Sequence, residues 1–388
     1  MRIAYPRRCG VAPACKQRFL NNVLTLFNTF TSSFPATFIF ANGRSVQLVL
    51  YPCRATGAFP FIVGGAGGAR ITTTTRAPVC SLQWNPAGTT VAGDGTAGVG
   101  AQQLNLPTDV FLASANTLFI VCTGASRVQR WTIGATQGVT VAGQADGSAG
   151  GNPNQLSNPT GVVVDRNGNI YVTDTVPGRI QLWPPGAAAG QTIAAGLNGP
   201  SGIAYDGNLN RLFVVETGNN RVIQYILANP VTSSVVAGTN VVPPANNPLN
   251  GPTGISFDPA SNSLLIANSG ANSIIQWFLT TNTFALVAGD SNGAAADGLN
   301  RLNSPRGVIW DPNGNIIVAD TGNRRVILFP PGQTDGTKNG RIIAGTGVAG
   351  NNNNQLNNPY AVRLDNQGNL LVVDSFNSRI QMFTCIQI

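Results

Sequence analysis

The sequence contains no histidine among its 388 residues. Histidine is the commonest general base near neutral pH and the commonest zinc ligand in proteins. Its absence excludes zinc-dependent hydrolysis and the nucleophilic mechanisms that pair a serine or a cysteine with histidine. We therefore expect a protein that is not an enzyme of these classes, and we predict no catalytic residue.

Cysteine is also scarce, and its spacing excludes two common uses. None of the six cysteines forms a Cys-x-x-Cys pair, so neither a zinc knuckle nor a thioredoxin-like redox site is indicated. Disulfides and buried thiols are the remaining uses. For Cys9, Cys15 and Cys53 the sequence assigns no pairing. It predicts no cofactor.

Charged residues make up only 10% of the chain, whereas there are 46 glycines and 25 prolines. This composition is typical of many short strands joined by turns. The net charge of +8 is unevenly distributed: residues 1–83 contain nine basic and no acidic residues, and residues 84–388 contain 14 basic and 15 acidic residues. The larger part of the chain is near neutral, which disfavours nucleic-acid binding.

Residues 1–63 form a basic, acid-free leader that we expect to be disordered or to act as a targeting signal. Asn21, Asn22, Asn28 and Pro35 interrupt its apolar part, so no clear membrane span is present. Residues 64–80 are rich in glycine and threonine and are typical of a linker. We favour a secreted or extracellular location, with mitochondrial targeting as the alternative. The sequence does not decide the compartment.

From residue 81 to residue 388 the sequence repeats one unit, represented best by residues 158–183. The unit has a Pro-x-Gly start, an apolar run ending in Asp165, a tight turn, and two further apolar runs ending in Asp174 and Trp183. These runs predict three antiparallel strands. One marker is the starting proline, found at Pro107, Pro159, Pro200, Pro252, Pro305 and Pro359.

A second marker, a short apolar run before glycine, predicts a fourth strand in each unit. It ends at Gly93, Gly143, Gly196, Gly238, Gly289 and Gly345. Six units of 41 to 54 residues with four short strands each predict an all-β fold. We expect a six-bladed β-propeller of four-stranded antiparallel blades over residues 81–388.

The order of the two markers indicates how the ring closes. The first strand of the second type, ending at Gly93, precedes the first proline, and none follows the sixth proline. Residues 82–93 should therefore form the outer strand of the last blade by pairing with residues 379–383. Cys80 and Cys385 flank these two segments, and we predict a disulfide between them. The alternative is two free thiols in a reducing compartment.

The repeats resemble NHL repeats over residues 82–388. The resemblance rests on the Pro-x-Gly-hydrophobic start, on DRNGNIYVTD at residues 165–174 and on DTGNRR at residues 320–325. It implies a six-bladed β-propeller. Members of this family are used mainly for protein or RNA recognition, and a few are enzymes.

Four units pair an acidic residue at the end of the second strand with an arginine five positions later. We interpret each pair as a pin for the intervening turn, with the guanidinium bonding the carboxylate in two places. The pairs are Asp174 with Arg179, Glu216 with Arg221, Asp320 with Arg325 and Asp374 with Arg379.

Two units depart from this pairing, with Asn268 and Ser273 in one and Cys122 and Arg127 in the other. Arg127 therefore lacks the expected acid. Together with Arg130 it is a candidate contact for an anion or a partner, and an ordinary solvated arginine is the alternative.

Three further binding candidates break the symmetry at the starts of the units. The residue after the starting proline is serine or threonine in four units, but it is Arg306 in the fifth and Tyr360 in the sixth. Asp109 replaces a glycine in the first unit. We expect these positions to lie near the mouth of the central channel. The long loops before the prolines should share a face with the turn of Arg127, and that loop-rich face is the default binding face.

Three hypotheses about function follow. The first is a non-catalytic interaction module, a monomer that binds a protein or peptide partner on the loop-rich face. The alternative is a metal-dependent hydrolase similar to the six-bladed lactonases and esterases, with calcium in the central channel and Asp109 as its only indication. The third is an RNA-binding propeller, which the near-neutral charge disfavours.

Overall fold

The computed structural model describes residues 80–113, 116–238, 248–332 and 339–387, together with three strands nearer the N-terminus. The chain divides into two compact units, Met1–Thr73 and Thr74–Ile388. Among the described residues no helix is long and apolar enough to cross a bilayer.

The first unit contains a three-stranded sheet. Strand β1 (Arg2–Ala4) pairs in parallel with β2 (Phe34–Ile39), which pairs in antiparallel fashion with β3 (Ser45–Leu50). The rest of the predicted leader, and the predicted linker except for Cys80, lie outside the described residues. The boundaries of these two segments therefore stay predictions.

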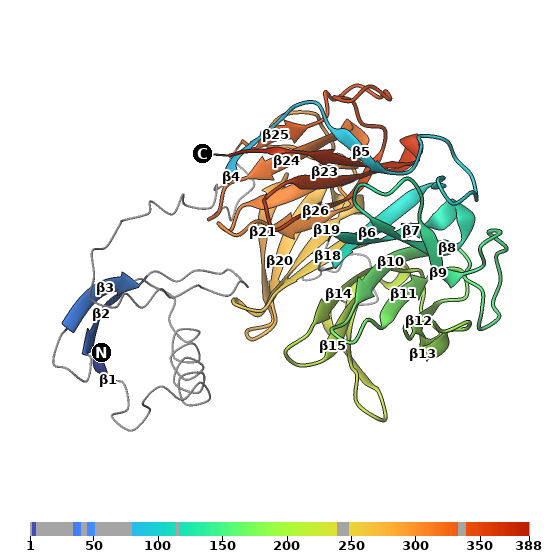
Figure 1. The fold of residues 1–388 in the computed structure, drawn as a ribbon, viewed down its shortest axis with the longest axis horizontal. Coiled ribbons are helices and arrows are strands. Elements are labelled where there is room, and N and C mark those ends of the chain that lie inside the picture. Colours follow the sequence, from blue (N-terminus) through green and yellow to red (C-terminus); the bar gives the residue numbers. More distant parts are fainter. Residues whose placement is uncertain are drawn as a thin grey trace, which may run out of the picture. The chain divides into compact units, whose positions relative to one another are not determined.

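The second unit is an all-β propeller of six four-stranded antiparallel blades, as predicted (Figure 1). Blade one has β6 (Pro107–Ala113), β7 (Thr117–Cys122), β8 (Arg127–Thr132) and β9 (Val139–Gly143). Blade two has β10 (Pro159–Val164), β11 (Ile170–Asp174), β12 (Arg179–Trp183) and β13 (Gln191–Ala195). Blade three has β14 (Pro200–Asp206), β15 (Arg211–Glu216), β16 (Arg221–Ile226) and β17 (Thr232–Gly238).

Blade four has β18 (Pro252–Asp258), β19 (Ser263–Asn268), β20 (Ser273–Phe278) and β21 (Thr283–Gly289). Blade five has β22 (Val308–Trp310), β23 (Ile316–Asp320), β24 (Arg325–Phe329) and β25 (Arg341–Ala344). Blade six has β26 (Pro359–Leu364), β27 (Leu370–Asp374), β28 (Arg379–Phe383) and β5 (Thr89–Ala92). In five blades a short 3-10 turn joins the second and third strands: η1 (Thr123–Ala125), η2 (Thr217–Asn219), η3 (Ser269–Ala271), η4 (Thr321–Asn323) and η5 (Ser375–Asn377).

The second strand of each blade is apolar because the neighbouring blades cover both of its faces. All five residues of β11 and of β27 are buried, for example. The large aromatic side chain near the end of each third strand is buried as well and forms part of the core. These side chains are Trp131, Trp183, Tyr225, Trp277, Phe329 and Phe383.

The first strands of the blades are the innermost strands, and each packs against the next around the ring. Their approach explains the glycine of the Pro-x-Gly start. A Cβ atom at Gly254 in blade four would overlap the carbonyl oxygen of Arg306 in blade five. Only glycine fits there without moving one of the two strands.

The ring closes as predicted, because β5 pairs in antiparallel fashion with β28 and completes blade six. A second pairing was not predicted. Strand β4 (Cys80–Trp84) pairs with β29 (Cys385–Gln387) in a two-stranded ribbon. The first and last strands of the propeller segment are therefore joined twice, once within blade six and once in the ribbon outside it.

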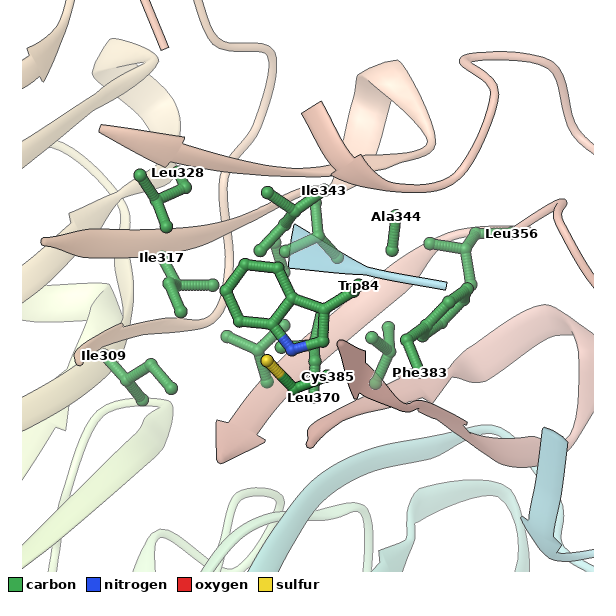
Figure 2. Packing of buried hydrophobic residues seen from close by; sticks show 14 residues of the cluster. Trp84, Ile309, Ile317, Leu328, Ile343, Ala344, Leu356, Leu370, Phe383 and Cys385 are labelled. Atoms are coloured by element: carbon green, nitrogen blue, oxygen red, sulfur yellow. The ribbon is translucent and has the colours of Figure 1, made fainter. Parts of the chain in front are cut away.

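Trp84 fills the seam between blades five and six. Figure 2 shows its indole between Ile317 and Ile343 of blade five and Phe383 of blade six. The side chain is only 7% exposed, and its Nε1 donates a hydrogen bond to the Gly368 carbonyl at 2.9 Å. Burying an aromatic side chain of this size stabilises the closure by about 2 to 3 kcal/mol.

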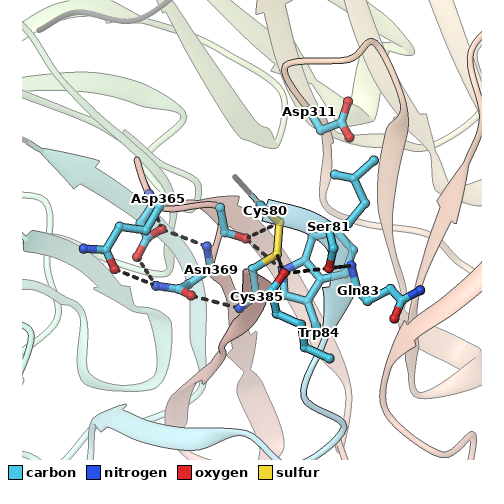
Figure 3. Close-up of a disulfide and its surroundings, with 12 residues drawn as sticks. Cys80, Ser81, Gln83, Trp84, Asp311, Asp365, Asn369 and Cys385 are labelled. Atoms are coloured by element: carbon cyan, nitrogen blue, oxygen red, sulfur yellow. Dashed lines mark hydrogen bonds between the residues drawn. A yellow bond between two sulfur atoms is a disulfide. The ribbon is translucent and has the colours of Figure 1, made fainter. Parts of the chain in front are cut away.

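The predicted disulfide between Cys80 and Cys385 is present beside this indole (Figure 3). It links residues that are 305 positions apart in the sequence. The backbone N–H of Cys385 donates to the Asn369 side chain at 2.9 Å, and Asn369 in turn donates to Asp365 at 2.8 Å. The disulfide is thus attached to the first hairpin turn of blade six.

We expect the Cys80→Ser/Cys385→Ser variant to fold and to be less stable by about 2 to 5 kcal/mol, since closing so long a loop restricts the unfolded chain. Urea unfolding of the full-length protein followed by tryptophan fluorescence measures the change. Adding dithiothreitol should lower the stability of the wild type and leave the variant unchanged. Equal stability of the oxidised wild type and the variant would contradict the role of the disulfide in closure.

Candidate functional site

The inner strands enclose a narrow central channel. One end of it is lined by the residues that follow the starting prolines, and this lining includes Asp109, Arg306, Tyr360 and Arg363. Its cavity volume is about 40 Å³, so the mouth of the channel is large enough to hold ordered water. The structure thus brings together three of the five predicted binding residues.

In four blades a pair of hydroxyl groups attaches the blade to the next one at the mouth of the channel. In blade two, Thr160 Oγ1 lies 2.8 Å from Thr175 Oγ1, and both hydroxyls donate to the Pro200 carbonyl of blade three. Thr108, Ser201 and Thr253 occupy the position of Thr160 in their blades. Each contacts a second hydroxyl of its own blade and donates to a carbonyl of the next blade. The small hydroxyl residues after the prolines are therefore structural.

Arg306 and Tyr360 interrupt this arrangement in blades five and six. Arg306 Nη1 donates a hydrogen bond to the Tyr360 hydroxyl at 2.6 Å, and the guanidinium lies 4.5 Å from the centre of the Tyr360 ring. Arg306 Nε is buried and has no hydrogen-bond acceptor. The two residues thus place a cation and an aromatic ring, both partly exposed, where the other blades have hydroxyls.

Asp109 connects three blades. One carboxylate oxygen accepts bonds from the Val110 N–H of its own blade and from Arg363 Nη2 of blade six, both at 2.9 Å. The other oxygen accepts from the Val162 N–H of blade two at 3.1 Å. Burial raises the pKa of the Asp109 carboxyl, and the Arg363 charge and the two N–H groups oppose that shift. Both oxygens of this carboxylate therefore accept hydrogen bonds that hold the three blades together.

Sequence reasoning missed Arg363. A signal was present, because Arg363 is a charged residue inside an otherwise apolar inner strand, and the other units have no basic residue four positions after the proline. Charged residues within buried strands are rare unless they are paired. Its partner Asp109 is 254 residues away and in contact only because the ring closes.

The channel lining does not fit calcium. Calcium takes six to eight oxygen ligands, several of them from carboxylates. Among the described lining residues the only carboxylate is Asp109, which is paired with Arg363, and the other charged group is the Arg306 guanidinium. No cluster of three cysteine or acidic residues that could hold a metal occurs within the described residues.

The four predicted acid–arginine pairs form, and each joins the end of the second strand to the start of the third. The expected bond in two places is wrong. In each pair the described bond to the carboxylate comes from the arginine Nε, and in Arg179, Arg325 and Arg379 both Nη atoms donate elsewhere. In blade five, Arg325 Nε donates to Asp320 at 2.8 Å, and its Nη atoms donate to the carbonyls of Asp297, Gly298 and Arg301.

These carbonyls belong to the long loop that precedes the starting proline. Arg127, Arg179 and Arg379 bond the carbonyls at the same three offsets in the loops of their own blades. Arg179, Arg325 and Arg379 thus hold a loop as well as a turn, and Arg127 holds a loop. The second oxygen of the acid assists, since Asp320 Oδ1 accepts from the Asn303 N–H at 2.7 Å in the same loop.

Arg127 and Arg130 do not belong to the channel site. Arg127 is 1% exposed and donates to four loop carbonyls, so it is neither a solvated arginine nor available to a partner. Its Nε, which bonds the acid in other blades, is buried without an acceptor, because Cys122 stands in place of that acid. Arg130 is exposed on β8, the third strand of its blade.

Aspartates at the ends of the first strands form the first hairpin turns of their blades. Asp165 accepts hydrogen bonds from the N–H groups of Asn167 and Asn169 at 2.8 and 2.9 Å. Asp311 and Asp365 form the same pair of bonds in blades five and six. None of these acids lines the described part of the channel.

Comparison with known proteins supports the repeat assignment. The family model described as NHL repeat matches residues 156–181 and 197–225, in blades two and three. Protein SUPPRESSOR OF QUENCHING 1, chloroplastic, from Arabidopsis thaliana is 26% identical over 268 residues, which cover 58% of this chain and 25% of that protein. The chain therefore spans about a quarter of the length of this curated relative.

Two solved structures have a similar fold. An auxiliary nutrient binding protein from Bacteroides thetaiotaomicron VPI-5482 superposes with a TM-score of 0.59 at 16% identity, covering 78% of this chain and 76% of that one. A protein of the same description from Bacteroides ovatus ATCC 8483 gives 0.58 at 16% identity, with 78% and 77% covered. At this identity the likeness shows the fold alone.

Cys122 should resist alkylation in the native protein. Burial raises the pKa of its thiol to about 11, although the neighbouring Arg127 charge opposes the shift. At pH 8 only about one thiol in a thousand would then be ionised, and iodoacetamide reacts with the thiolate. Site-resolved mass spectrometry should find Cys122 unmodified in the native full-length protein and modified in urea. Rapid native labelling at pH 8 would contradict this placement.

Asp109→Gly should destabilise the propeller by about 2 to 4 kcal/mol, even though four of the other five units have glycine at this position. The change leaves the Arg363 guanidinium unpaired and the Val162 N–H without an acceptor. Urea unfolding measures the loss. Asp109→Asn, which keeps an acceptor oxygen, should lose less, and Arg363→Val should recover part of the stability of Asp109→Gly. An Asp109→Gly variant as stable as wild type would exclude the bridge.

Proposed function

We propose, since this chain is an NHL-repeat six-bladed β-propeller, that it is a non-catalytic interaction module. Its partner is a protein or peptide that binds at the loop-rich end of the central channel. We propose that it binds as a monomer and without a cofactor.

The pair of Arg306 and Tyr360 at the channel mouth carries this proposal. Both residues depart from the hydroxyl pattern that the other four blades use to join neighbours, and both are partly exposed. Arginine and tyrosine are among the residues that contribute most to binding at protein interfaces. A pair that gives up a structural bond and remains accessible supports a role in recognition.

Exposed apolar side chains surround the same end of the propeller. The turn η5 packs against both β26 and β6, next to the channel, and its Phe376 is 59% exposed. Other exposed apolar residues lie in the second turn of blade two and in the loops before the prolines: Val176, Val99, Leu106, Leu299 and Val348. Apolar side chains on one face favour contact with a protein surface.

The acidic residues of the channel argue against hydrolysis. A general acid or base must be free to exchange a proton with a substrate. Asp109 is the only carboxylate among the described lining residues, and it is held by Arg363 and two backbone N–H groups. The disulfide supports an oxidising location, and we propose a secreted or extracellular protein.

Selection of peptides from a random display library on the full-length protein tests the proposal. The Arg306→Thr/Tyr360→Thr variant is the control, because it carries at both positions a hydroxyl residue like those of the other blades. We expect selected peptides to bind the wild type at least tenfold more tightly than this variant, provided that both melt at the same temperature. Peptides that bind both equally, or no selected peptide, would contradict the proposed site.

Two further measurements address the other hypotheses. Hydrolysis of aryl esters or lactones that requires calcium, and is lost in Asp109→Asn, would support the hydrolase instead. RNA binding whose affinity falls steeply with salt concentration would support the RNA-binding propeller.

A further inference from the structure

We infer that Arg306 receives a carboxylate group of the partner at the mouth of the channel. This inference rests on the proposed function, because it names the chemical group that the same site recognises. It goes further by assigning the group to one side chain. The argument uses the charge and the unsatisfied hydrogen bonds of the site.

The charge at the mouth is positive and belongs to Arg306. Three charged side chains line the described channel: Asp109, Arg306 and Arg363. Asp109 and Arg363 compensate each other across 2.9 Å. Arg306 has no carboxylate among its described contacts, and its charge is balanced only by the face and the hydroxyl of Tyr360. An anion is therefore the favoured occupant.

The hydrogen bonds of Arg306 are incomplete. A guanidinium has five N–H donors, and the described bonds of Arg306 use one of them, from Nη1 to Tyr360. Its Nε is buried without an acceptor, and leaving a buried donor without a hydrogen bond destabilises a folded protein. The edge formed by Nε and Nη2 matches the two oxygens of a carboxylate. A bound carboxylate would satisfy both atoms.

Tyr360 holds this edge in place. Its hydroxyl accepts from Nη1 and its ring faces the guanidinium, so the side chain of Arg306 has one defined orientation. A donor group that is already oriented loses little entropy when it binds. Tyr360 is thus a positioning residue for Arg306 as well as part of the surface.

The proposed partner decides the kind of anion. Because that partner is a protein or a peptide, the anion that it can offer to the Arg306 guanidinium is a carboxylate. The carboxylate can come from the C-terminus of a peptide or from an aspartate or glutamate side chain.

NMR of the full-length protein labelled with ¹⁵N-arginine tests the anion site directly. The probes are sodium acetate and sodium phosphate, with sodium chloride at equal ionic strength. We expect acetate to shift the Nε–H signal of Arg306 saturably, and a phosphate affinity at least tenfold higher than that of acetate would assign the site to phosphate instead. Arg306→Thr identifies the signal by its loss, and Tyr360→Phe should weaken acetate binding. An equal shift with chloride, or none with acetate, would overturn the inference.

Matched peptides separate this inference from the proposed function. Each peptide from the display selection is compared with its C-terminal amide and with its Asp→Asn or Glu→Gln form. We expect one of these changes to weaken binding to the wild type at least tenfold and to have no effect on binding to Arg306→Thr. If every neutral form binds as tightly and Tyr360→Thr still abolishes binding, the carboxylate is excluded and the interaction module stands. If acetate binds but no peptide does, the interaction module fails and the anion site stands.

Discussion

Closure of the ring is the constraint on which the rest of the structure depends. A propeller blade is covered on both faces only when its neighbours are present. Blades one and six are therefore complete only after the first and last strands of the propeller have paired. The pairing of β5 with β28, the ribbon of β4 and β29, and the disulfide all act at this seam. The same seam brings Asp109 beside Arg363. The candidate site is therefore a product of closure.

The inner strands leave little freedom to the residues that line the channel. Glycine is needed where one strand approaches the next, and hydroxyl residues join neighbouring blades. Asp109 is tolerated at a glycine position because its carboxylate bonds the Val162 N–H of the adjacent strand rather than pushing that strand away. In contrast, the side chains of Arg306 and Tyr360 do not form the hydroxyl-to-carbonyl hydrogen bond that joins neighbouring blades. Their side chains are engaged mainly with each other.

The periodicity of the sequence was enough to predict the fold, its closure and the Cys80–Cys385 disulfide, since each depends on equivalent positions in a ring. It also placed Asp109, Arg306 and Tyr360 together. It was not enough for Arg127, because the carbonyl groups that bind its guanidinium belong to a loop whose path the side-chain pattern does not encode. Nor did it identify Arg363, whose ionic partner among the described residues, Asp109, lies across the seam. Contacts made by backbone atoms, or across the closure, leave no repeated signal.

The arginine pins also bear on how the loop-rich face can recognise a partner. Loops of this length and composition would ordinarily be mobile, and ordering them on binding would cost conformational entropy. Here buried guanidinium groups hold four of them, each through three carbonyls. A partner therefore meets a face that is largely ordered in advance. Recognition can then depend on a few side chains at its centre, and of the charged side chains described at the channel mouth Arg306 is the one without an ionic partner.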